Sequence, residues 1–262
     1  MSKFIKNIIK MKLDGMFAKF FEDKESATPR TPCIHGSDII KPDKREDGKS
    51  DYRFCYRECV LKHFYDAHEE KKNNSYLNKI FLNGWVLHEK WQMLLEKYAE
   101  VIAIEKTIWD DEFKVAYTPD AHIKMMGKEI IVEIKGWKQE EYDKYDEEGP
   151  CPESPLKQAL VYCFLTGVKH AIVLVENKNT QAFKLWYIDY DDSLIVDIIE
   201  RLAKLKQYIA EWEIDPKKLP EKLCKSKTEE RAKSCGMCKV CFASDKTRVN
   251  YVKQPRIKEE EV

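Results

Sequence analysis

The sequence predicts a mixed α/β domain in which helices flank a central sheet. Segments with apolar residues at helical spacing occur on both sides of a region rich in short β-branched runs, and the two kinds of segment alternate along the second half of the chain. An amphipathic helix and a half-apolar sheet each bury their apolar face most economically against the other. A sheet between helices is therefore the expected architecture.

Composition supports a folded protein and excludes some functions. The chain has 262 residues, of which 43% are hydrophobic, and its 46 basic and 46 acidic side chains give a formal net charge of zero. This apolar content can form a core, and a neutral total argues against a passive polyanion binder while leaving room for a local basic groove. No apolar run reaches eighteen residues and no secretion signal is recognisable, so we expect a cytoplasmic protein without a membrane partner.

The first hundred residues predict three helices and one connection. Residues 1–23 are amphipathic, with charges interrupting each apolar patch, and residues 24–50 are rich in Pro, Gly, Asp and Lys, as in a surface connection. Residues 51–70 and 76–99 have apolar side chains at helical spacing. We place an N-terminal helix and linker over 1–50.

The rest of the chain predicts strands alternating with helices. The helix over 155–167 begins at a proline and ends at a glycine, and the segment 191–212 is amphipathic. An acidic connection over 138–154, expected to be mobile, separates the first strands from this helix. The expected strands are 101–109, 113–118, a pair within 117–137, 170–176 and 183–190. With a cysteine-bearing segment over 213–242, the main domain spans 51–242, and 243–262 form a loose polar tail.

The strand pair between Tyr117 and Trp137 carries the first chemical signal. Gly127 permits a tight turn, which brings Asp120 close to Glu133 although thirteen positions separate them in sequence. Because alternate strand residues share a face, Glu133 and Lys135 point one way and the residue between them enters the core. Two carboxylates and an ammonium suit a hard cation such as Mg²⁺ and a phosphate beside it. On these residues alone, a solvated strand edge explains the same pattern.

Two pairs of polar residues on helices add to this signal. Gly84 lies one turn before His88, where a glycine would let another backbone approach and the histidine could bind a metal. Gln158 and Tyr162 share a helix face and could donate hydrogen bonds to a phosphate or a base. Each pair alone is also common on helices without such a role.

In order, G-x-x-x-H, P-D, E-I-K and Q-x-x-x-Y resemble the motifs of the PD-(D/E)XK nucleases, in particular the RecB-like branch, over about residues 50–242. The resemblance implies a restriction-endonuclease-like core and Mg²⁺- or Mn²⁺-dependent hydrolysis of DNA from single-stranded ends, in recombination, replication or repair, such as in a phage. It implies that His88, Asp120, Glu133 and the carbonyl of Ile134 bind the metal. Lys135 would be the catalytic lysine, and Gln158 and Tyr162 would hold the nucleic acid. The alternative is a non-catalytic nucleic-acid-binding module that keeps the fold; the sequence names no protein partner.

Cysteines near the C-terminus give the second chemical signal. Cys224, Cys235, Cys238 and Cys241 lie within eighteen residues of a chain that has nine cysteines and no secretion signal, which predicts a metal site. The four could hold one zinc ion, or an earlier cysteine could join three of them around a [4Fe–4S] cluster.

The same nuclease family favours the cluster, because some members tie the C-terminus to an early helix with one cysteine from a C-P-R motif and three from the tail. Here Cys55-Tyr56-Arg57 is similar, with tyrosine in place of proline. The resemblance implies Cys55, Cys224, Cys235 and Cys241 as ligands, in a structural role. Cys238 in place of Cys224, or Cys59 in place of Cys55, remain alternatives.

Overall fold

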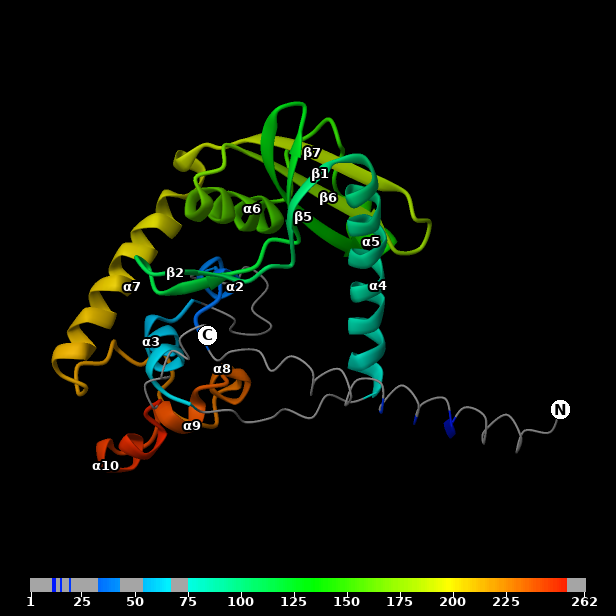
Figure 1. The fold of residues 1–262 in the computed structure, drawn as a ribbon. Coiled ribbons are helices and arrows are strands. Elements are labelled where there is room, and N and C mark those ends of the chain that lie inside the picture. The colour runs from blue at the N-terminus through cyan, green and yellow to red at the C-terminus, as the bar shows by residue number, and fades with distance from the viewer. Residues whose placement is uncertain are drawn as a thin grey trace, which may run out of the picture.

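The computed structural model describes residues 33–42, 54–66 and 75–253, together with isolated positions before residue 20. The predicted helix over 1–23 and the chain beyond residue 253 lie outside these ranges. Within them the predicted fold class is confirmed: a central mixed sheet is flanked by helices (Figure 1). None of the described helices is both long enough and apolar enough to cross a membrane.

The elements follow the predicted order with shifted boundaries. The described helices are α2 (Gly36–Ile39), α3 (Tyr56–Phe64), α4 (Ser75–Tyr98), α5 (Gln139–Tyr142), α6 (Glu153–Thr166), α7 (Val196–Ile214), α8 (Glu230–Ser234), α9 (Cys238–Cys241), α10 (Asp245–Arg248) and the 3₁₀ turns η1 (Asp192–Ile195) and η2 (Val249–Tyr251). The strands are β1 (Glu100–Ile104), β2 (Ile108–Asp110), β3 (Val115–Tyr117), β4 (Ala121–Met125), β5 (Lys128–Trp137), β6 (His170–Asn177) and β7 (Phe183–Asp189).

The main sheet has five strands in the order β1-β4-β5-β6-β7, and only the β5–β6 pair is parallel. A parallel pair needs a crossover connection, which α5 and α6 provide. The β4–β5 hairpin turns at Met126 and Gly127, whose φ angles of 52° and 77° are left-handed, as the glycine predicted. The single strand expected over 101–109 is wrong: β1 joins the main sheet, and β2 pairs only with β3.

Helices cover the sheet on both faces. Leu87 of α4 packs with Ile130, Val132 and Ile134 of β5, whereas the α6 residues Ala159, Tyr162 and Cys163 pack with Ile131 and with alternate residues of β6. The alternation follows from the period of a strand. It leaves Glu133 and Lys135 on the side of α6, at the end of β5 where the hairpin opens.

A third core lies beside the sheet, between α2, α3, α7 and the C-terminal segment. The expected surface connection is wrong for residues 33–42, because Ile34 and Ile39 are fully buried there. Arg201 of α7 fixes this segment by donating to the carbonyls of Ile39 and Lys41, at 2.6 and 2.7 Å. The loose tail predicted from residue 243 onwards is wrong up to residue 253, where Arg248 is buried in helical turns.

The acidic connection over 138–154 is fastened to β7. Lys184 donates to the carbonyl of Tyr142 at 2.9 Å, and the indole of Trp186 donates to that of Gly149 at 3.2 Å. Glu147 accepts a hydrogen bond from the backbone of Leu185 at 2.9 Å. These bonds, which the composition of the loop did not predict, hold it against the sheet close to the end of β5.

Candidate metal site and cysteine cavity

The β4–β5 hairpin brings Asp120 and Glu133 together, as its sequence predicted. Ala121 pairs with Val132, so the two acidic residues take the next positions of the antiparallel register. Asp120 Oδ2 accepts a hydrogen bond of 2.6 Å from the backbone nitrogen of Ile134, which fixes the carboxylate at the mouth of the hairpin. Burial raises the pKa of Asp120, and the nearby His88 opposes this change.

Glu133 is the most unusual side chain of the site. It is 0% exposed, and neither of its carboxylate oxygens has a hydrogen-bond partner among the described residues. Its one charged contact is between Oε1 and the ammonium of Lys135. Burial, reinforced by the charge of Asp120, raises its pKa to about 8. A buried carboxylate with an unused oxygen is the donor that a hard divalent cation requires, so these residues fit such an ion.

Helix α4 supplies His88, and its position depends on a glycine that we did not predict. Gly136 of β5 allows the close approach, because a Cβ there would lie 2.6 Å from Leu87 Cδ1. The role expected of Gly84 is wrong, since no described atom lies within 4 Å of the place of its Cβ. His88 Nδ1 lies 3.5 Å from Asp120 Oδ1. Burial alone would lower the pKa of His88, but the hydrogen bond to Glu105 and the surrounding carboxylates raise it.

Two residues of the site escaped the sequence analysis, Glu105 and Gln92. Glu105 directly follows β1, and its Oε1 lies 3.4 Å from His88 Nδ1. Gln92 lies one turn after His88, is 6% exposed and donates to Glu105 Oε1 and to the carbonyl of Asp120, both at 3.1 Å. The spacing from His88 to Gln92 is a signal that could have been noticed. Glu105, a single acid in a strand-like segment, gave no signal.

A chain of side chains connects the site to α6. Lys135 donates to Gln158 Oε1 at 3.2 Å, and the Gln158 amide donates to the hydroxyl of Tyr162 at 3.1 Å. Tyr162 is 4% exposed, and its ring lies so close to Gly36 that a Cβ there would be 3.0 Å from Cε1. Tyr162 therefore supports Gln158, and through it Lys135, while its ring packs against Gly36 of α2.

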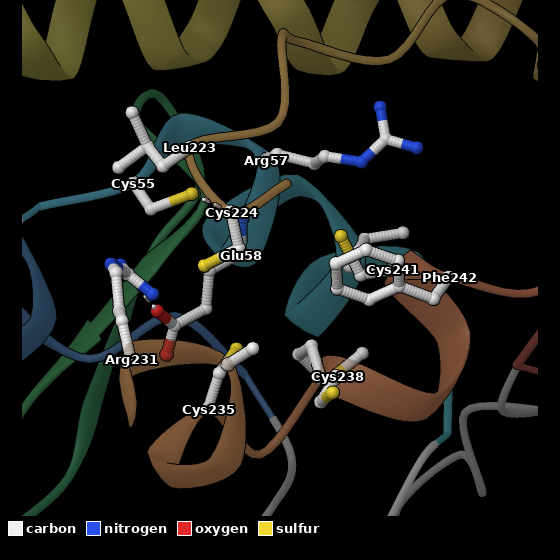
Figure 2. A pocket seen from close by; sticks show the side chains of 13 residues that line it. Cys55, Arg57, Glu58, Leu223, Cys224, Arg231, Cys235, Cys238, Cys241 and Phe242 are labelled. Atoms are coloured by element: carbon white, nitrogen blue, oxygen red, sulfur yellow. Dashed lines mark hydrogen bonds and ion pairs between the residues drawn. The ribbon is translucent and has the colours of Figure 1, made fainter. Parts of the chain in front are cut away.

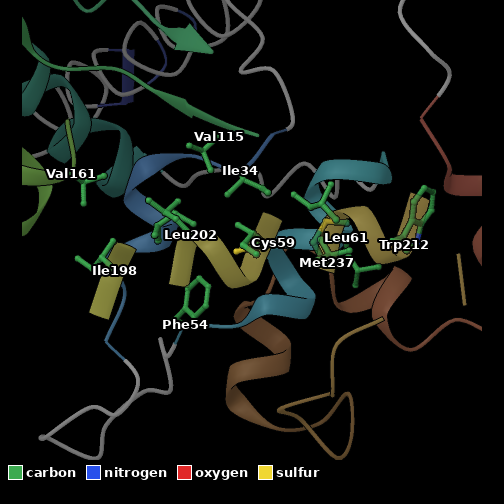
Figure 3. Packing of buried hydrophobic residues seen from close by; sticks show 14 of the residues in the cluster. Ile34, Phe54, Cys59, Leu61, Val115, Val161, Ile198, Leu202, Trp212 and Met237 are labelled. Carbon is green, nitrogen blue, oxygen red and sulfur yellow. The ribbon is translucent and has the colours of Figure 1, made fainter. Parts of the chain in front are cut away.

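Five cysteines line one cavity of about 330 Å³, part of it open to solvent. Figure 2 shows them around the space between α3, α8 and α9: Cys55, Cys224, Cys235, Cys238 and Cys241. Cys55 is the N-cap of α3, so the early helix does meet the C-terminal segment. Cys59 does not reach the cavity, because it is 2% exposed among apolar side chains of the third core (Figure 3). Cys59 is therefore not among the ligands that we propose below.

The spacing and charges of the cavity bear on the kind of metal. Among the described residues, no three cysteine sulfurs lie within 4.8 Å of one another. In a tetrahedral zinc site with bonds of about 2.3 Å, the sulfurs would be about 3.8 Å apart, whereas a cluster of several irons holds its thiolates more widely. Burial raises the pKa of Cys235 to about 12 and raises that of Cys55, while the Arg231 guanidinium opposes both changes. Arg231 also pairs with Glu58 at 3.2 Å.

Comparison with known proteins gives structural neighbours only. No protein-family model and no curated protein matches the sequence. The structure is similar to LHK-Exo in complex with dAMP, with a TM-score of 0.49 and 16% identity over 72% of this chain and 95% of that chain. A second structure of this alkaline exonuclease, from Laribacter hongkongensis, has a TM-score of 0.46 and 16% identity, over 75% of this chain and 98% of that chain. A phage-related exonuclease from Haemophilus somnus 129PT has a TM-score of 0.47 and 14% identity, over 70% of this chain and 96% of that chain. Each TM-score is below 0.5, so the similarities establish neither the family nor the activity of this chain.

Proposed function

We propose that this protein is a deoxyribonuclease that hydrolyses phosphodiester bonds at DNA ends with Mg²⁺ or Mn²⁺. The observation that carries the proposal is Glu133, a fully buried carboxylate with an oxygen that no described residue uses, placed between Asp120 and Lys135. Burying a carboxylate in this way is costly unless a cation compensates it.

The residues divide into a cation side and a phosphate side. His88, Asp120, Glu133 and the carbonyl of Ile134 would hold the ion, which would stabilise the charge that develops on the phosphate. Lys135 keeps its proton, because burial alone lowers its pKa but the adjacent Glu133 raises it above the usual value. Its ammonium, held by Gln158, can donate to a phosphate oxygen. Tyr162 keeps Gln158 in place by accepting its hydrogen bond, and it is too buried to contact the DNA.

The substrate class follows from this division and from the motifs. A hard cation beside a protonated lysine suits a phosphodiester, and the order of G-x-x-x-H, P-D, E-I-K and Q-x-x-x-Y resembles that of exonucleases acting on DNA. We therefore propose single-stranded ends as substrate, with a role in recombination, replication or repair.

For the cysteine cavity we propose a [4Fe–4S] cluster bound by Cys55, Cys224, Cys235 and Cys241, with Cys238 as the alternative to Cys224. Two observations support this choice over one zinc ion: no three cysteine sulfurs of the described residues lie within 4.8 Å of one another, and the cationic Arg231 lies beside them. The cluster would join the N-terminus of α3 to the segment that carries α8 and α9. We propose a structural role for it. A link between residue 55 and the C-terminal cysteines closes a long loop, and closing a long loop restricts the unfolded chain strongly.

The nuclease proposal is tested with single-stranded DNA labelled separately at each end, in Mg²⁺, Mn²⁺ or chelator. We expect metal-dependent shortening, lost in Glu133→Ala. The matched control is Glu129→Ala, which removes an exposed acid of the same hairpin that pairs with His122 at 3.1 Å; it should cleave like the wild type. If the folded, iron-replete wild type binds DNA without cleaving it, the non-catalytic binding module replaces the nuclease.

The cluster is tested by iron and acid-labile sulfide analysis after anaerobic purification. Cys235→Ser should lose iron, whereas Cys163→Ser, which alters a buried cysteine of α6, should keep it. Stoichiometric zinc without sulfide would replace the cluster by a zinc site and leave the nuclease proposal untouched. A Cys235→Ser protein as rich in iron as the wild type would exclude Cys235 as a ligand.

A further inference from the structure

We infer that Glu105 is a further ligand of the divalent cation and shares one ion with His88 and Asp120. This inference rests on the proposed function and adds to it a residue that lies outside the P-D, E-I-K and G-x-x-x-H motifs. Glu105 is placed there by the pairing of β1 with β4, in which Ile104 lies opposite Ala121. That register brings the residue after β1 beside the residue before β4.

The three side chains are spaced for one ion. His88 Nδ1 lies 3.4 Å from Glu105 Oε1 and 3.5 Å from Asp120 Oδ1, and one ligand atom from each residue lies within 4.8 Å of the others. Adjacent ligands of an octahedral Mg²⁺ with bonds of about 2.1 Å are about 3.0 Å apart. The two distances from His88 are within about 0.5 Å of this value, and the limit of 4.8 Å on the remaining pair leaves room for oxygens on opposite sides of the ion, about 4.2 Å apart.

The backbone around Glu105 is arranged to keep its carboxylate in this place. Its φ angle of 42° is left-handed, a conformation that a glutamate adopts only when its surroundings impose it. Its backbone nitrogen donates to the carbonyl of Asp120 at 3.3 Å. The buried amide of Gln92 bridges the same carbonyl and Glu105 Oε1. One glutamine thus fixes the positions of two acidic residues relative to each other.

A second observation at the same place points to a ligand. Glu133, whose Oε2 has no hydrogen bond or ion pair among the described residues, is fully buried and lies opposite Asp120 in the antiparallel register of β4 and β5. Glu105 has 46% of its side chain exposed, so the cation can enter from solvent on that side. The competing explanation is that Glu105 only orients the imidazole of His88 without touching the ion.

Mn²⁺ binding to the DNA-free protein, measured from the free-ion electron paramagnetic resonance signal, separates these explanations. The variants are Glu105→Gln, His88→Asn and the double variant; asparagine keeps a weak oxygen ligand, so binding stays measurable. If Glu105 contacts the ion, Glu105→Gln should weaken Mn²⁺ binding about tenfold or more in the wild type and by a similar factor in the His88→Asn background. If it acts only through the imidazole, its loss should have no effect once His88 is replaced.

A matched control is available on the same hairpin. Glu129→Gln removes the charge of another glutamate that contacts a histidine, His122, and should leave Mn²⁺ binding unchanged. An unaltered affinity in Glu105→Gln, or a loss confined to the background that retains His88, overturns the inference while the nuclease proposal stands. A folded wild type that binds no Mn²⁺ overturns both.

Discussion

Replacing Glu133 by glutamine should abolish cleavage and, in the absence of metal, make the protein more stable. Both effects have one cause. The side chain is fully buried, and burial raises its pKa from the reference value of 4.5 to about 8. A glutamine has nearly the same shape and cannot ionise, so it removes the cost of the buried acid together with its capacity to bind a cation.

The magnitude follows from the two pKa values. Below pH 4.5 the carboxyl is protonated in both the folded and the unfolded chain, so it does not affect stability. Between pH 4.5 and about 8 the unfolded chain releases the proton and the folded chain retains it, so the free energy of unfolding falls as the pH rises. pH 7 lies about 2.5 units above the reference value, and each unit corresponds to about 1.4 kcal/mol, so the penalty there is about 3.5 kcal/mol. An unpaired buried amide costs about 1 to 3 kcal/mol, which leaves a gain of about 0.5 to 2.5 kcal/mol for the variant.

The assay is urea unfolding of both proteins with chelator, at several pH values from 5 to 8. Groups common to both proteins cancel in the difference, so the variant should gain on the wild type as the pH rises. Mn²⁺ should then raise the midpoint of the wild type more than that of the variant. A variant that is less stable than the wild type at pH 7 would refute the reasoning, because it would show that the carboxylate is already compensated in the folded protein.

Three further predictions concern other parts of the molecule. Burial alone would raise the pKa of Asp38, but the ammonium groups of two lysines hold it at about 2, so its stabilisation is complete above pH 3.8 and is lost as the pH falls towards 2. Asp38→Asn should therefore lower the free energy of unfolding by about 2 kcal/mol at pH 7 and by much less at pH 2, measured by urea unfolding. Gly36→Ala should lower kcat severalfold at little cost in melting temperature, because the added methyl group displaces the ring of Tyr162, whereas Gly84→Ala should leave kcat unchanged. Lys135→Ala should abolish cleavage in the labelled-DNA assay and retain DNA binding by anisotropy; cleavage in that variant would remove the lysine from the mechanism.

The part of the site that could be predicted is the part that lies within one hairpin. Asp120, Glu133 and Lys135 are related by the period of a strand and by one turn, and both are readable in sequence. His88 could be named as a possible metal ligand, but its place beside the hairpin could be expected only through the resemblance, because its distance from the hairpin depends on how α4 packs. That packing is set by Gly136, which in the sequence is simply the residue after a lysine.

The parts that could not be predicted depend on contacts between distant segments. Glu105 lies in the site because β1 pairs with β4, and no local sequence pattern predicts that pairing. Residues 33–42 looked like a surface connection because their neighbours are polar, yet two isoleucines fill the third core. Burial of so few apolar residues among charges has no periodicity from which it could be recognised.

The charged side chains of that third core also connect the segment with α8 and α9, which carries the cysteines, to the rest of the domain. Arg231, beside the cysteines, pairs with Glu58 at 3.2 Å; Lys62 pairs with Glu58 at 3.3 Å and with Asp38 at 2.7 Å. Asp38 belongs to α2, the helix whose first residue contacts the ring of Tyr162. Such buried pairs add little net stability, but breaking one leaves an uncompensated charge, so each member fixes the position of the next. The placement of Lys135 therefore depends, through α2 and Tyr162, on the segment that carries the cysteines.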